Sequence, residues 1–94
     1  MLKVVAKSFF YEEKVDEALK LYEELVRETQ KETGCISYNL YQDINDRIIL
    51  TMLEEWESME CFNNHIKSDH YKKLIPEISK FRKSSEINKY ELVV

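Results

Sequence analysis

Glycine and proline are almost missing from this chain of 94 residues, which contains one of each. P-loops, dinucleotide-binding turns and the nucleophile elbow of hydrolases each need two or more glycines in a short span. The backbone there approaches a phosphate closely or passes through positive φ. The sequence therefore excludes these three kinds of site, and we expect a protein that needs no flavin.

Long apolar runs are missing as well. No stretch approaches the roughly 20 apolar residues that cross a bilayer, and the start MLK lacks the charged-then-apolar layout of a signal peptide. We therefore expect a cytoplasmic protein that does not bind membranes. Cys35 and Cys61 are the two cysteines, and no CxxC motif is present. We expect two buried thiols rather than a disulfide, a zinc site or a redox pair.

Charge of one sign is not concentrated anywhere in the chain. The 18 acidic residues are interleaved with 14 basic residues, for a formal net charge of −4, so we expect no nucleic-acid partner. Hydrophobic residues make up 44% and aromatic residues 12% of the sequence, contents that disordered chains lack. Residues 1–94 are therefore expected to fold as a single domain. A domain of this size has a thin core, so association of two copies is also expected.

The spacing of apolar residues predicts helices where they recur every three to four positions and strands where they alternate. In chain order the predicted elements are a strand at 3–11, a helix at 14–31, strands at 35–42 and 47–56, a helix in two parts at 59–66 and 69–81, and a strand at 86–94. This order is the ferredoxin-like βαββαβ arrangement of the α+β class, an antiparallel four-stranded sheet with helices on one face.

Individual residues predict where some elements begin and end. Ser58 and Ser68 are good N-caps for the two short helices. Gly34 is expected to end the first helix in the left-handed conformation. Pro76 removes a backbone donor and is expected to kink or divide its helix.

Two predicted strands differ in the character of their faces. Ile36, Tyr38 and Leu40 alternate with polar residues, so they are expected to share one apolar face. The strand at 47–56 begins apolar on both faces. A sheet with helices on one side should meet water on the other, so the second apolar face suggests that another sheet packs there.

Three segments in order resemble the antibiotic biosynthesis monooxygenase (ABM) domain family. They are residues 32–38 (ETGCISY), 54–58 (EEWES) and 65–71 (HIKSDHY). The family's pattern is roughly E-x-G-C-x-x-Y, E-x-W-x-S and H-x-x-S-x-H. The resemblance implies a dimeric α+β barrel, in which two sheets meet face to face. For some members it also implies a cofactor-free oxidation of quinols or polyketide phenols.

Such an oxidation needs a substrate that can itself give electrons to O2, such as a phenol or hydroquinone. Deprotonation makes that substrate more reducing, so the protein must supply a base and a dry cavity. His65 is the candidate catalytic base, because imidazole titrates near neutral pH. We expect it to be partly exposed and bonded to Asp69 one turn later, if the helix is unbroken. The alternative is a histidine that only packs or caps between helices.

Trp56, Phe62 and His70 are the candidate substrate-binding residues. Phe62 lies one helical turn before His65, and the strand that ends at Trp56 leads into the same helix, so these side chains can converge. Trp56 is equally explicable as a core residue. No metal is expected, because the rings of His65 and His70 diverge at i,i+5 on a regular helix. The family resemblance also argues against haem, since the axial histidine of haem-degrading relatives has no counterpart after His70.

We therefore expect a homodimeric monooxygenase or oxidase that acts with O2 on a small aromatic molecule such as a quinol and uses no cofactor. Two other functions fit the same residues. One is an isomerase of a small carbonyl metabolite, and the other is a dimer that binds a small ligand without catalysis.

Overall fold

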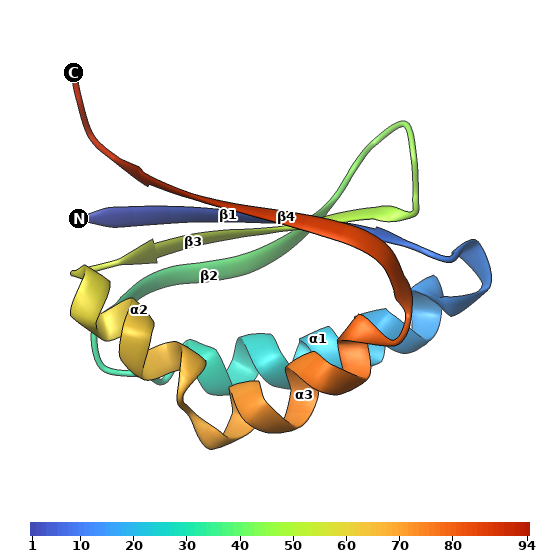
Figure 1. The fold of residues 1–94 in the computed structure, drawn as a ribbon, viewed down its shortest axis with the longest axis horizontal. Helices are drawn as coiled ribbons and strands as arrows, with labels where there is room; N and C mark the ends of the chain where they lie inside the picture. Colours follow the sequence, from blue (N-terminus) through green and yellow to red (C-terminus); the bar gives the residue numbers. More distant parts are fainter.

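The structure, a computed structural model, describes residues 1–94 and consists of one four-stranded sheet with three helices on one face (Figure 1). The elements are β1 (Leu2–Phe10), a 3-10 turn (Glu12–Lys14), α1 (Val15–Thr29), β2 (Cys35–Gln42), β3 (Ile49–Trp56), α2 (Met59–Ile66), α3 (Asp69–Ser79) and β4 (Arg82–Glu91). The strand order is β2-β3-β1-β4, and every neighbouring pair is antiparallel. This confirms the predicted ferredoxin-like α+β fold.

The core lies between the sheet and the helices. Strand side chains alternate between the two faces, and the helix side of β3 carries Leu50, Met52 and Trp56, each at most 3% exposed. Leu25 of α1 and Leu74 of α3 belong to the same core and contribute to it from the helix layer. Tyr38 on β2 also belongs to this core, as its alternation with apolar residues predicted. None of the helices has the length and hydrophobicity of a membrane-spanning segment.

Both predicted N-caps are confirmed. The Ser58 side chain accepts a hydrogen bond from the Cys61 amide at the start of α2, and the Ser68 side chain accepts one from the Tyr71 amide at the start of α3. These bonds satisfy backbone donors that the first turn of a helix leaves without partners. Cys61 itself and Cys35 are free thiols, and both are half-buried rather than fully buried as we expected.

Gly34 does not end α1, and Pro76 does not divide α3. Helix α1 ends at Thr29, so Gly34 does not terminate it. Gly34 has a φ of +84° in the loop before β2, where a Cβ would overlap the Cys61 side chain. Helix α3 runs from Asp69 to Ser79 with Pro76 inside it, so Pro76 does not divide the helix. The break between helices is the Lys67–Ser68 step.

The two edge strands also differ from their predicted form. β4 begins at Arg82 rather than at residue 86, since a polar segment can pair through its backbone with β1 without burying side chains. Ile36 is 46% exposed instead of sharing the face of Tyr38, because the register of β2 shifts between Cys35 and Ser37. Such a bulge leaves one residue without a partner opposite it.

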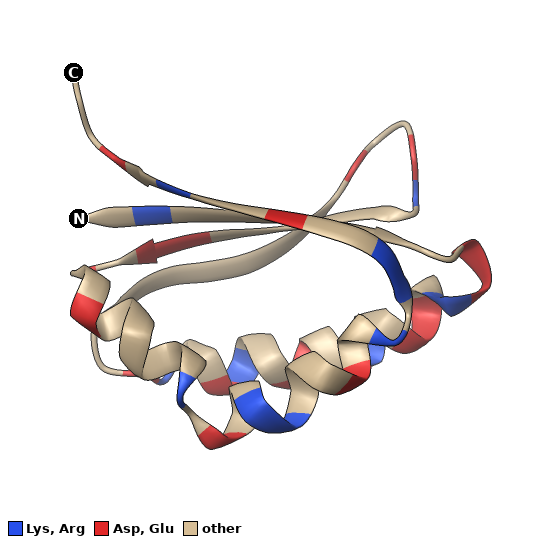
Figure 2. Ribbon diagram, viewed as in Figure 1, with Lys and Arg blue, Asp and Glu red and all other residues tan.

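The sheet face away from the helices is uncovered in this chain (Figure 1). Leu53, Tyr41 and Tyr90 are 41–53% exposed there or at its rim. Charged residues of both signs lie on the helices and on the strands, and no stripe of one sign is visible (Figure 2). The bare face carries apolar side chains, as the pattern of residues 47–56 predicted, together with the Lys3–Glu55 ion pair.

Candidate functional site

A cavity of about 170 Å³ lies between the sheet and helices α2 and α3. Eight of its 13 lining residues are hydrophobic, among them Met52 and Phe62. The polar groups that face it include Glu54 from β3, His65 from α2 and Arg82 at the start of β4. The cavity is thus an apolar space with a few titratable groups on its wall, which is the usual make-up of a small-molecule site.

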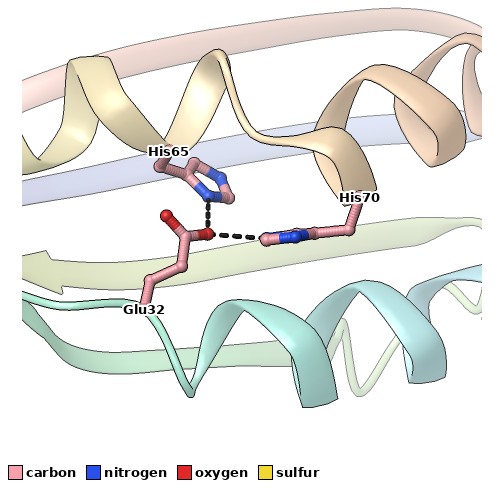
Figure 3. A group of neighbouring side chains, drawn as sticks. All are labelled: Glu32, His65 and His70. Atoms are coloured by element: carbon pink, nitrogen blue, oxygen red, sulfur yellow. Dashed lines mark hydrogen bonds and ion pairs between the residues drawn. The ribbon is translucent and has the colours of Figure 1, made fainter.

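His65 and His70 share one carboxylate oxygen. The Oε2 atom of Glu32 lies 2.7 Å from Nδ1 of His65 and 2.7 Å from Nε2 of His70 (Figure 3). Glu32 comes from the loop between α1 and β2, whereas the two histidines lie on either side of the helix break. Three separate segments therefore build this cluster.

The backbone around each member explains how the cluster is held. The Glu32 amide donates to the Thr29 carbonyl, and the Cys35 amide donates to the Glu32 carbonyl, so Glu32 lies in a tight turn. At the helix break, the Ser68 hydroxyl donates to the His65 carbonyl over 2.7 Å. This bond and the Ser68 N-cap turn the chain so that His70 faces the same carboxylate as His65.

The cluster corrects two expectations about His65. Its partner is Glu32 and not Asp69, because the break after Lys67 ends the helical spacing on which the Asp69 bond depended. His65 is also only 1% exposed, so it is not the partly exposed residue that we expected. Replacing it would remove packing as well as an ionisable group.

The hydrogen bonds define the tautomer of His65. An ionised carboxylate only accepts hydrogen bonds, so Nδ1 of His65 must carry the proton that meets Glu32. Burial lowers the pKa of His65, while the Glu32 carboxylate opposes this shift and raises it. The ring is therefore neutral at pH 7, with an unprotonated Nε2. That atom has no hydrogen-bond partner in the protein, and His65 lines the cavity.

Aromatic rings surround the imidazole. The ring centroid of His65 lies 4.9 Å from that of Trp56 and 6.2 Å from that of Phe62. Tyr38 and Tyr71 add edge contacts at 5.2 and 5.0 Å. The predicted convergence of Trp56, Phe62 and His65 is therefore found.

The predicted site residues do not all face the cavity. Phe62 and His65 line it, but Trp56 is fully buried behind them and His70 lies on the Glu32 side of His65. Trp56 and His70 contact the candidate base. Substrate contact by either residue stays a prediction.

Glu32, His65 and His70 are the residues that could hold a metal, since their ligand atoms lie within 4.8 Å of one another. Two histidines and a carboxylate suit several divalent transition metals. We expected the two rings to diverge on a regular helix, but the helix is broken at Lys67–Ser68 and the rings meet at Glu32. The 2.7 Å contacts equally describe two hydrogen bonds to one carboxylate, an arrangement that needs no ion.

Glu54 is a cavity residue to which we assigned no role from the sequence. It is 6% exposed, and its Oε1 accepts a hydrogen bond from the Trp56 indole over 3.0 Å. Burial raises its pKa to about 7, against the lowering effect of that bond. A signal was available, because Glu54 occupies a position on the helix-facing side of β3 where alternation demands an apolar residue.

Comparison with known proteins finds a matching family and structures that share this fold. The family model for antibiotic biosynthesis monooxygenase matches residues 1–77. A crystal structure of an antibiotic biosynthesis monooxygenase is 32% identical, covers 100% of both chains and superposes with a TM-score of 0.96. A conserved protein from Methanosarcina mazei Go1 is 46% identical over 95% of this chain and 89% of that chain, with a TM-score of 0.92.

More distant structures share the fold alone. A protein from Mycobacterium tuberculosis is 19% identical, with a TM-score of 0.92 over 99% of this chain and 95% of that chain. No curated protein sequence matches the chain.

Proposed function

Because the chain belongs to the antibiotic biosynthesis monooxygenase family, we propose that it is a monooxygenase or oxidase. It would use O2 and no cofactor to oxidise a small aromatic molecule such as a quinol. The observation that carries this proposal is the Glu32–His65 pair beside an apolar cavity. His65 would be the base that removes a phenolic proton through Nε2, and Glu32 would hold the ring and stabilise the imidazolium that forms.

The proposed oxidation uses the base and the apolar wall of this cavity, the substrate and O2. A hydroquinone deprotonated by His65 gives up electrons more readily, and dioxygen is the acceptor. In a monooxygenation, hydroquinone and O2 give hydroxyquinone and water. In an oxidation, two electrons and two protons pass to O2, giving quinone and hydrogen peroxide. The apolar wall, including Phe62, would keep water away from the phenolate.

The size of the cavity supports a small substrate. A cavity of about 150 Å³ takes one benzene ring, and the cavity beside His65 measures about 170 Å³. One substituted ring is therefore a better fit than the several fused rings of a polyketide.

Oxygen uptake with a panel of hydroquinones tests the proposal. The wild-type protein should consume O2 above the autoxidation rate, and His65→Gln should lose about 10²- to 10⁴-fold in kcat, the range of general-base catalysis. Rates should be given per folded molecule, because His65 is buried. Tyr41→Phe is a matched control on the opposite face of the sheet and should keep the wild-type rate. A wild-type rate equal to autoxidation would reject the proposal.

The isomerase alternative uses the same base without O2. Exchange of a substrate carbon-bound hydrogen for deuterium, in the absence of oxygen, would favour it over the oxidation. A protein that binds hydroquinones but shows neither activity would be a binding module.

We also propose a homodimer formed through the bare sheet face. The apolar side chains on that face include Val5, Phe9, Ile49 and Leu53, which are partly or well exposed in the single chain. Two such faces packed together should bury well above about 1,000 Å². Sedimentation should show dimers at micromolar concentration, and monomers alone would contradict the proposal. The cytoplasmic location stays a prediction.

A further inference from the structure

Glu54 is a buried carboxyl group in a position that packing does not explain. Its neighbours on the same face of β3, Met52 and Trp56, are apolar or aromatic core residues, and it lies opposite Val4 of β1. Burying a carboxyl group among such residues is costly unless it is paired or protonated. No lysine, arginine or histidine nitrogen lies within ion-pair distance of Glu54.

One oxygen of this carboxyl group is free for a ligand. The Trp56 indole donates to Oε1, while Oε2 has no hydrogen-bond partner in the protein. Oε2 is itself accessible rather than buried. Among the buried side-chain nitrogen and oxygen atoms, only Thr29 Oγ1 lacks a hydrogen-bond partner, and Oε2 is not among them. Glu54 lines the cavity, so the open side of its carboxyl group is the cavity itself.

We propose that Glu54 is a second catalytic residue, a protonated carboxyl group that passes protons between reduced dioxygen and the second hydroxyl group of a single-ring diol. This inference rests on the proposed function. His65 Nε2 and Glu54 Oε2 both lack a hydrogen-bond partner in the protein, and both residues line the same cavity, in which eight of 13 lining residues are hydrophobic. A ring with two oxygen substituents has one polar group for each of these atoms, whereas a simple phenol has a single one.

The protonation state of Glu54 suits this role. Burial raises its pKa to about 7, the Trp56 hydrogen bond opposes the rise, and the charge of Glu32 adds to it. The other titratable or charged groups on the cavity wall are Tyr22, Tyr38, His65, Tyr71, Arg82 and Glu86. Burial raises the pKa of the three tyrosines, so they are neutral at pH 7. The Arg82 guanidinium bonds to Ser8 and Ser79 rather than to Glu54.

The proposed step balances in protons and electrons for a hydroquinone. His65 takes the proton of the first hydroxyl, and two electrons pass from the ring to O2. Glu54 gives its proton to the reduced oxygen and regains one from the second hydroxyl, which becomes acidic as the ring is oxidised. The imidazolium of His65 supplies the last proton, so quinone and hydrogen peroxide leave and both residues return to their starting forms.

Glu54→Gln is the variant that separates this role from a structural one. Its amide carbonyl can still accept the Trp56 hydrogen bond, but the side chain can neither lose nor supply a proton in this range. With hydroquinone as substrate, kcat should fall about 10²-fold, at the low end of general acid–base effects. The wild-type rate should decline above pH 7 as Glu54 ionises, and this alkaline limb should be absent from the variant.

Trp56→Phe is the companion variant. It removes the donor to Glu54 but leaves the carboxyl group in place. Because the Trp56 bond lowers the pKa of Glu54, the alkaline limb should persist and move to higher pH. If Glu54 only positions Trp56, Glu54→Gln should instead match the wild type while Trp56→Phe loses activity, and the proposal is then wrong.

A binding measurement separates this proposal from the proposed function. Calorimetric titration of hydroquinone without oxygen, at pH 7 in two buffers of different ionisation enthalpy, counts the protons exchanged. Filling the cavity further buries Glu54, so the wild type should take up protons and Glu54→Gln should not. Equal proton uptake by the wild type and Glu54→Gln would overturn the role of Glu54. If the wild type consumes no oxygen but shows this uptake, only the proposed oxidation fails, and an absence of binding at millimolar hydroquinone overturns both.

Should Glu54→Gln fail to fold, Glu54→Met takes its place, because a linear apolar side chain suits a position between Met52 and Trp56. It should show the same loss of the alkaline limb and of proton uptake. A Glu54→Met protein that still shows the alkaline limb or the proton uptake would overturn the proposal.

Discussion

Replacing Glu54 by glutamine should remove a pH-dependent cost to the stability of the folded protein. The carboxyl group is 6% exposed and has one hydrogen-bond donor, from Trp56. Its pKa rises from an ordinary value of 4.5 to about 7, chiefly because of burial. The folded protein therefore binds this proton more tightly than the unfolded chain does. Stability contributed by Glu54 is complete below pH 4.5 and is lost as the pH rises through 7.

The size of this effect follows from the shift. Each unit of pKa corresponds to about 1.4 kcal/mol, so ionisation of Glu54 should lower the free energy of unfolding by about 3 kcal/mol in all. Most of the change falls between pH 5 and pH 8.5. Glutamine does not titrate in this range. The free energy of unfolding of Glu54→Gln, relative to that of the wild type, should therefore rise by about 2 to 3 kcal/mol from pH 5 to pH 8.5.

Urea denaturation of both proteins at several pH values measures the difference. The comparison cancels the contribution of His65, which both proteins share. Its pKa is lowered in the folded state, so it reduces stability as the pH falls below about 6.5, opposite in direction to Glu54. Equal m-values for the two proteins would show that the unfolded states are comparable.

A constant stability difference between pH 5 and pH 8.5 would refute this reasoning. It would mean that the folded protein solvates the Glu54 carboxylate as well as water does. The carboxyl group would then be ionised at pH 7, and its role as a proton donor would fail with it.

Three further predictions concern the residues around the base. His65→Ala should lower the free energy of unfolding by about 3 to 5 kcal/mol, because the ring is 1% exposed and bonded to Glu32, and an unchanged urea midpoint would contradict this packing. Glu32→Gln should lower kcat with hydroquinone about 5- to 30-fold, since a charged acceptor is roughly twice as strong as a neutral one. It should also move the acid limb of kcat/KM to lower pH, because Glu32 raises the pKa of His65, and an unmoved limb would exclude this coupling. Gly34→Ala should destabilise the protein by more than about 1 kcal/mol in thermal or urea unfolding, because its φ is +84° and a Cβ would overlap Cys61, and a neutral result would show that the loop can shift.

Much of the fold could be read from local patterns in the sequence. Apolar spacing located all four strands and three helices, and Ser58 and Ser68 marked two helix starts, because periodicity and capping depend on residues within one or two turns. Three short motifs also identified the family. Local signals also suggested two breaks that the structure does not have, a helix end at Gly34 and a division of α3 at Pro76.

The candidate site was only partly predictable. His65 and Phe62 were found because they share a helix face, and Trp56 because its strand leads into that helix. Glu32 was missed as the partner of His65, since the pair lie 33 positions apart and meet only through the turn after α1. Residues close in sequence, such as His65 and Asp69, were expected to bond, but the helix break separates them.

The sequence by itself determined the order of elements, the faces of most strands and the family, because each depends on spacing or on motifs that stand in the chain. Only the tertiary structure decided which carboxylate holds His65, how deeply His65 is buried, and that Glu54 faces a cavity. These properties depend on where loops place distant segments and on how much water the packed helices exclude. The same carboxyl group has an ordinary pKa in an exposed strand and a raised pKa in a buried one.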